Sequence, residues 1–113
     1  MAEVLGTFEQ AVLLALVQPE TAQGKEAYGR AILKEVQLRL DREVAAGAVY
    51  ATLDRLEQKG LISSHLGAGT EVRAGRPRRY YSIEPAGIRA LNESKSAVDR
   101  LWAGIRLPLK GNA

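Results

Sequence analysis

Four arginines close together are the residues of this chain whose chemistry is clearest. They are Arg73, Arg76, Arg78 and Arg79, and no acidic residue lies between Arg73 and Ser82. A guanidinium group is permanently charged and donates hydrogen bonds in a fork that matches phosphate oxygens. The net charge of the whole chain is only +3, so the local cluster, not the bulk composition, indicates contact with a phosphate backbone. The alternative is a solvated loop of surplus charge.

A second group of candidate residues lies on a helix predicted over about residues 46–59. Val49, Leu53 and Leu56 recur at the spacing of one helix face, which predicts that they pack in the core. The side chains expected to point outward include those of Ala48, Ala51, Thr52 and Arg55. Methyl groups can pack on thymine methyls, whereas Arg55 alone offers a strong donor to guanine or phosphate. This helix would therefore give few direct hydrogen bonds to DNA bases.

Two tyrosines carry hydroxyl groups that could bind phosphate. Tyr50 lies at the edge of the core face. Either its hydroxyl donates to a phosphate while the ring packs inward, or Tyr50 is only an amphipathic residue at the core edge. Tyr28 lies near the start of a predicted second helix, where backbone amides favour an anion.

The arginines on the predicted return strand, residues 77–83, cannot all face the same way. Side chains alternate along a strand, so Arg76 and Arg78 share one face and Arg79 has the other. At least one of them is therefore expected to serve the fold. Glu57 is a candidate partner, because an acid on the core side of a helix needs a positive neighbour.

Residues for catalysis or for metal binding are scarce. His65 is the only histidine and cysteine is absent, so thiolate metal sites and disulfides are excluded. There is no metal-ligand spacing and no glycine motif of the kind that cradles phosphates. The longest apolar run, residues 11–17, is too short to span a membrane, and no secretion signal precedes it. We expect a cytoplasmic protein that is not an enzyme and needs no cofactor.

The elements that would position these residues form a simple order. The sequence predicts helices over about 5–17, 26–40, 46–59 and 85–107, and strands over 61–66 and 77–83. Gly60 ends the third helix and Pro85 begins the last one. This order is that of a winged helix-turn-helix, mostly α with a small two-stranded β-wing, and hence of the α+β class. We expect one domain over residues 1–113, with a core of about 5–83 and a C-terminal helix of about 85–107.

The first and last helices are expected to join two subunits. The second half of the first helix is apolar nearly all round, and the last helix carries an apolar seam with a seven-residue repeat that Ser94 interrupts. The alternatives are a buried central helix and a last helix that packs back on its own domain. The predicted dimer interface comprises Leu5, Phe8, Val12, Leu91, Val98, Leu101, Trp102 and Ile105.

Several short strings of this sequence resemble one family. They are Tyr28–Gly29, Gly47, Val49–Tyr50, Leu53–Ile62, Gly75–Ile83 and Gly87. They resemble the PadR family of bacterial transcriptional regulators, and the likeness spans roughly residues 5–105. The match is to the family's compact form, which has a single C-terminal dimerisation helix.

This resemblance implies a homodimeric winged-helix repressor that binds a pseudo-palindromic operator in double-stranded DNA, with the helix over 46–59 in the major groove. It also implies release by a small aromatic effector, for which Phe8, Val98 and Trp102 would line an apolar cavity; dry interface packing is the alternative. Ala45 stands where the family often has a capping serine or threonine, and Val98 where drug-binding members have a tryptophan. The rival function is a winged-helix module that binds protein or RNA.

Overall fold

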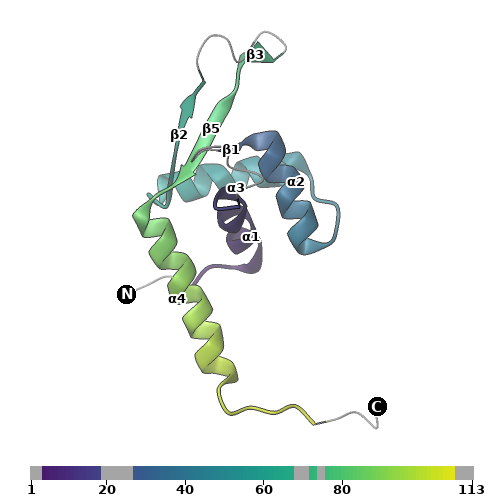
Figure 1. The fold of residues 1–113 in the computed structure, drawn as a ribbon, viewed down its shortest axis with the longest axis vertical. Helices are drawn as coiled ribbons and strands as arrows, with labels where there is room; N and C mark the ends of the chain where they lie inside the picture. Colours follow the sequence, from purple (N-terminus) through teal and green to yellow (C-terminus); the bar gives the residue numbers. More distant parts are fainter. Residues whose placement is uncertain (1–3, 19–26, 68–71, 74–75, 109–113) are drawn as a thin grey trace.

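The structure is a computed structural model of the 113-residue chain and describes residues 4–18, 27–67, 72–73 and 76–108 (Figure 1). Its helices are α1 (Thr7–Leu16), α2 (Gly29–Leu40), α3 (Ala46–Gln58) and α4 (Pro85–Trp102). Its strands are β1 (Ala27–Tyr28), β2 (Ile62–Leu66), β3 (Val72–Arg73), β4 (Arg76–Pro77) and β5 (Arg79–Ile83). The predicted winged-helix order, mostly helical with a small antiparallel wing, is confirmed.

The hydrophobic core lies where α1, α2 and α3 meet, with α1 in the middle (Figure 1). Val12, Leu13 and Ala15 of α1 are fully buried within the single chain. The chain's own core thus covers most of this apolar segment, as in the alternative of a buried central helix, whereas Leu14 and Val17 stay 38% and 40% exposed. Leu5 and Val12 were predicted to lie in a dimer interface, and that prediction is wrong: at 3% and 0% exposure they have no surface left for a partner.

Local chemistry sets the ends of the helices around α3. Asp41 ends α2 in the left-handed conformation, and the Gln37 side-chain carbonyl accepts a hydrogen bond from the Val44 amide at 3.0 Å, which shapes the turn into α3. Ala45 caps α3 without a side-chain hydrogen bond, as its methyl side chain requires. Gly60 follows α3 with a φ of 78°, a conformation that costs glycine little, and the chain turns directly into β2.

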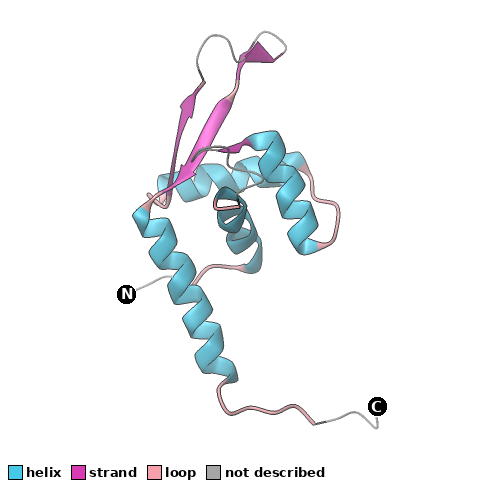
Figure 2. Ribbon diagram, viewed as in Figure 1, coloured by secondary structure: helices cyan, strands magenta, loops and turns pink. Residues whose placement is uncertain are grey.

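The wing is a three-stranded antiparallel sheet in the order β1-β5-β2, with a separate two-stranded pair of β3 and β4 (Figure 2). The short strand β1 was not predicted; its two residues pair with the middle of β5. The pairing register divides the side chains between two faces. We call the face toward the helices the inner face; it carries Ile62, Ser64, Leu66, Arg79, Tyr81 and Ile83. The outer face carries Tyr28, Ser63, His65, Arg78, Tyr80 and Ser82.

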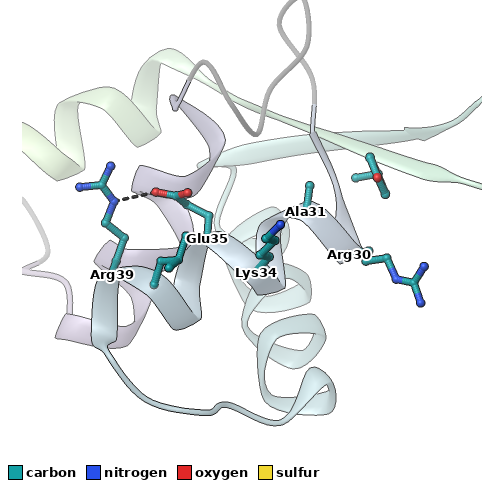
Figure 3. Close-up of a pocket in the computed structure, with 7 residues that line it drawn as sticks. Arg30, Ala31, Lys34, Glu35 and Arg39 are labelled. Carbon is teal, nitrogen blue, oxygen red and sulfur yellow. Dashed lines mark hydrogen bonds and ion pairs between the residues drawn. The ribbon is translucent and has the colours of Figure 1, made fainter.

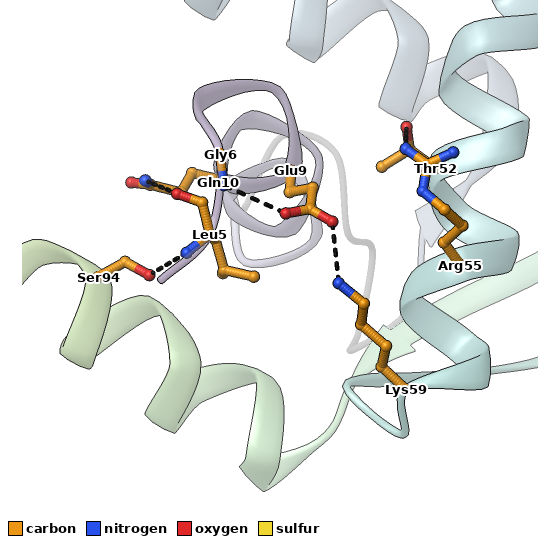
Figure 4. Close-up of polar contacts among 8 residues, drawn as sticks. All are labelled: Leu5, Gly6, Glu9, Gln10, Thr52, Arg55, Lys59 and Ser94. Carbon is orange, nitrogen blue, oxygen red and sulfur yellow. Dashed lines mark hydrogen bonds and ion pairs between the residues drawn. The ribbon is translucent and has the colours of Figure 1, made fainter. Parts of the chain in front are cut away.

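Helix α4 has two halves with different surroundings. Its first half packs back on the domain through Gly87, Ala90 and Ser94, and Gly87 lies so close to the Leu61 carbonyl that a methyl group there would overlap it. Ser94 is fully buried, and its hydroxyl accepts a hydrogen bond from the Leu5 amide at 2.9 Å (Figure 4). The second half projects from the domain in the direction opposite to the wing (Figure 1).

Candidate nucleic-acid interface

Helix α3 buries a different set of residues from the one predicted. Val49, Leu53 and Leu56 are buried as expected, but Thr52 is only 2% exposed and joins them. Its hydroxyl accepts a hydrogen bond from the Arg55 guanidinium at 3.0 Å (Figure 4). Thr52 was predicted to face DNA, and that prediction is wrong, because its methyl group packs like an apolar side chain while Arg55 satisfies its oxygen.

Three other residues predicted to face DNA lie on the exposed part of α3, next to a hollow that Phe8 of α1 also lines. Ala48, Ala51 and Arg55 are exposed and line a hollow of about 430 Å³ together with Phe8 and residues 42–45. Below them Lys59 forms an ion pair with Glu9 of α1, with 3.2 Å between the ammonium nitrogen and the carboxylate oxygen (Figure 4). The hydrogen bond to the buried Thr52 holds Arg55 at the edge of the exposed face of α3.

Of the residues at the centre of the exposed face, the sequence analysis predicted Ala51 and missed the other three. Each residue of an α-helix is rotated by about 100° from the one before it. The side of α3 opposite the four buried positions therefore runs through Gly47, Ala51, Asp54 and Gln58. All four are exposed. Counting Thr52 as an outward residue had shifted the predicted face toward Arg55. The repeat of three and four residues along these positions was the signal that could have identified them.

Tyr50 lies on the other edge of α3, against the first turn of α2. A methyl group at Gly29 would overlap the Tyr50 ring, so the ring lies directly on this glycine. The side chain is still 43% exposed. The hydroxyl end of the ring thus packs against Gly29, and the Tyr28–Gly29 pair owes its glycine to this close approach. A hydrogen bond from this hydroxyl to a phosphate stays a prediction.

A row of aromatic side chains crosses the outer face of the sheet. The rings of His65 and Tyr80 are stacked with centroids 6.0 Å apart, and Tyr80 meets Tyr28 edge to face at 6.1 Å. The Arg78 guanidinium lies over the Tyr28 ring, 4.4 Å from its centroid. A cation held on an aromatic face keeps its charge and its outer donors. This arrangement places Arg78 next to the start of α2.

A hydrogen-bonded chain ties the inner face of the sheet to α3. The Arg79 guanidinium donates to the Ser64 hydroxyl at 3.0 Å, and this hydroxyl donates to the two carboxylate oxygens of Glu57 at 3.0 and 2.9 Å. The predicted structural arginine is therefore Arg79, and it reaches Glu57 through Ser64. Beside them Tyr81 is buried; burial raises the pKa of its hydroxyl, Arg79 opposes that shift, and nearby acids reinforce it.

The two remaining arginines of the predicted cluster are described by backbone alone. Arg73 and Arg76 face each other across the β3–β4 pair. Their side chains lie outside the described part of the structure, so their contact with DNA stays a prediction.

The outer side of α2 adds further positive charge next to Tyr28. Arg30 and Lys34 are exposed and line a hollow of about 1000 Å³ along this helix (Figure 3). Arg39 is paired with Glu35 at 2.7 Å, so its charge is balanced. The net surplus therefore lies toward the start of α2, the end near Tyr28 and Tyr50.

The projecting half of α4 and the segment that follows it carry half of the residues predicted to join two subunits. Val98, Leu101, Trp102 and Ile105 are 44%, 74%, 53% and 59% exposed, whereas Leu91 and Phe8 are half-buried against the core. Phe8 lines the hollow beside α3, and Val98 and Trp102 lie on the projecting helix. One chain thus does not form the predicted effector cavity.

Among the described residues, no group of histidine, cysteine or acidic side chains is arranged to hold a metal ion. Within the same residues no helix is long and apolar enough to cross a membrane.

Comparisons with known proteins agree with this geometry. Residues 20–93 match the model of the transcriptional regulator PadR-like family. The chain is 38% identical over 80 residues to the transcriptional regulator Rv3488 of Mycobacterium tuberculosis, covering 71% of this chain and 70% of that protein. It resembles the crystal structure of a PadR family regulator from Eggerthella lenta, with a TM-score of 0.67, 29% identity and 88% and 78% of the two chains covered.

A further similar structure is a PadR family transcription regulator from Clostridium difficile R20291. Its TM-score is 0.62 and its identity 27%, and the match covers 86% of this chain and 95% of that one. The family match over more than half of the residues, together with these relatives, leads to one conclusion: this chain belongs to the PadR-like family of transcriptional regulators.

Proposed function

We propose that two copies of this chain form a homodimer that binds a pseudo-palindromic operator in double-stranded DNA and represses transcription in the cytoplasm. The observation that carries the DNA-binding part is a continuous surface from α3 to the wing. Tyr50 lies on Gly29, the adjacent Tyr28 carries Arg78, and Arg30 follows on the same helix. A tyrosyl hydroxyl, a helix start and two guanidinium groups side by side suit a phosphate backbone running past α3.

The second half of α4 supports the dimer. Val98, Leu101 and Trp102 are large apolar side chains left exposed on one projecting helix, and Ile105 is exposed just beyond its end. Contiguous apolar surface of this kind marks a protein contact, and a second copy of the same helix would cover it symmetrically. Because α4 projects away from the wing, such pairing leaves both wings free (Figure 1). Two recognition helices would then lie about 34 Å apart, or a multiple of this, to enter successive major grooves.

A titration against duplex DNA tests this function. We expect the purified chain to sediment as a dimer and to bind its own upstream region, with affinity that falls steeply with salt and with preference for a two-fold symmetric site. Substitution of Leu101 by Asp should give a folded monomer with weak DNA binding. A chain that remains a monomer at micromolar concentration, or one that prefers RNA or protein to any duplex, would contradict the proposal and favour the rival interaction module.

The effector part of the proposal depends on the dimer. Only pairing of two chains could bring Phe8 near Val98 and Trp102, because one chain keeps them on separate parts of the surface. Trp102 is the sole tryptophan, so quenching of its fluorescence by flat aromatic compounds reports on such a cavity. Quenching that saturates and accompanies release of DNA is expected; linear quenching with no effect on DNA binding contradicts an effector site.

A further inference from the structure

We infer that Asp54 reads a base of the operator, accepting a hydrogen bond from the amino group of a cytosine in the major groove. This inference rests on the proposed function. It begins with the exposed line of α3 defined above, which runs through Gly47, Ala51, Asp54 and Gln58 opposite the buried positions. When a recognition helix enters the major groove, the side opposite its core is the one nearest the bases.

The polar residues that flank this line are already engaged within the chain. Arg55 donates to Thr52, Glu57 accepts from Ser64, and Lys59 pairs with Glu9. By contrast, Asp54 and Gln58 form no side-chain hydrogen bond or ion pair with any residue that the structure describes. A ligand could therefore contact their polar groups without displacing a side-chain hydrogen bond or ion pair of the described residues.

The order along the line favours Asp54 over Gln58. Residues in the first part of a recognition helix lie closest to base edges. Gly47 and Ala51 come first but have no side-chain hydrogen-bonding group, so Asp54 is the first residue of the line that has one. Gln58 is the last residue of α3 and lies furthest from that end.

The chemistry of a carboxylate defines the base. An ionised Asp54 only accepts hydrogen bonds, and it is repelled by phosphates and by other acceptors. In the major groove guanine presents two acceptors and thymine one, whereas cytosine presents the N4 amino donor. Cytosine is thus the base that best offsets the repulsion of the carboxylate by the duplex. Adenine, with a donor beside an acceptor, is the weaker match.

The test is selection of duplexes from a random pool, followed by affinity measurements on duplexes that differ at single base pairs. For the wild-type chain we expect a preference for cytosine at one position of each half-site, by about fivefold to a hundredfold. Asp54→Ala should lose this preference, and Asp54→Asn should move it toward adenine, which the asparagine amide can contact with two hydrogen bonds. Glu93→Ala is the control, because Glu93 is an exposed acid of α4.

Two results would overturn the inference. One is an Asp54→Ala variant with the same base preferences as the wild type at every position. The other is an equal gain in affinity for all duplexes, which would mean that the carboxylate only repels phosphate. Both leave the proposed function standing, whereas a wild-type chain that binds no duplex removes the function and the inference together. Circular dichroism should show all three variants folded, because their side chains are exposed.

Discussion

The two faces of the wing sheet are made from alternate residues of the same strands, yet they have different tasks. On the outer face Arg78 lies over the ring of Tyr28, with Tyr80 and His65 continuing the row. On the inner face its neighbour Arg79 is tied through Ser64 to the carboxylate of Glu57. A shift of one residue thus separates an arginine that presents its charge from one that holds the wing to α3.

Charge balance makes the same distinction. Arg79 shares its surroundings with Glu57, so the pair adds little to the field outside the protein. Arg78 forms no ion pair with a carboxylate of any described residue, and its guanidinium lies over the ring of Tyr28. Arg78 therefore contributes a net positive charge beside Tyr28, at the start of α2, and of the two it is the one suited to bind phosphate.

The largest expected effect tests whether the inner face alone supports the fold. Tyr81 is 5% exposed, and Tyr81→Ala should lower the free energy of unfolding by about 3–5 kcal/mol, because it leaves a cavity beside α3. Tyr80→Ala on the outer face should cost roughly 1 kcal/mol, mainly lost ring contacts. Urea unfolding of both variants measures the difference. Equal losses would show that the two faces share the structural task.

The next effect concerns DNA. Arg78→Gln should weaken binding to any duplex by about tenfold and lower the salt slope by about one for each subunit. Arg79→Gln should leave the slope unchanged, because its guanidinium is held by Ser64 and not by phosphate. Titrations at several salt concentrations give both slopes. If the two variants lose the same slope, the division of labour between the faces is wrong.

A smaller effect isolates the tie between the wing and α3. Ser64→Ala removes the hydroxyl that joins Arg79 to Glu57 and should lower the free energy of unfolding by about 1 kcal/mol. The matched control is Ser63→Ala, which removes a hydrogen bond of 3.1 Å to Ser82 on the outer face and should cost about 0.5 kcal/mol. A Ser64→Ala variant as stable as the wild type would mean that the tie is not needed.

Sequence reasoning predicted the parts of this arrangement that follow from the regular spacing of side chains along a strand or a helix. The alternation of side chains along a strand separated Arg78 from Arg79, and the position of Glu57 identified its partner. It could not find the intervening Ser64, because register across two strands depends on how the hairpin closes. Strand β1 was also missed, since two residues carry no pattern and their pairing with β5 is set by tertiary packing.

The errors at Thr52, Leu5 and Val12 have a related cause. Each residue was assigned a surface from its chemical type or from the surplus of apolar residues around it. A threonine can be buried when a neighbour satisfies its hydroxyl, as Arg55 does here. An apolar helix can be largely covered by its own domain, as α1 is by α2, α3, β5 and α4, although Leu14 stays exposed. Neither outcome can be read from one sequence, because both depend on which elements meet.

The finest test of the comparison uses pH. Burial raises the pKa of Tyr81 above the ordinary value of 10.0, which the unfolded chain keeps. As pH rises past this value, the unfolded state loses the proton first, so the free energy of unfolding falls until the folded state has lost it too. The stabilisation from neutral Tyr81 is therefore complete below pH 10 and lost above it.

Tyr81→Phe should flatten this decline in urea titrations at alkaline pH, since it keeps the buried ring and has no proton to lose. Parallel curves for Tyr81→Phe and the wild type would show that the ring on the inner face is better hydrated than the structure indicates, and the contrast between the two faces would then be one of charge alone.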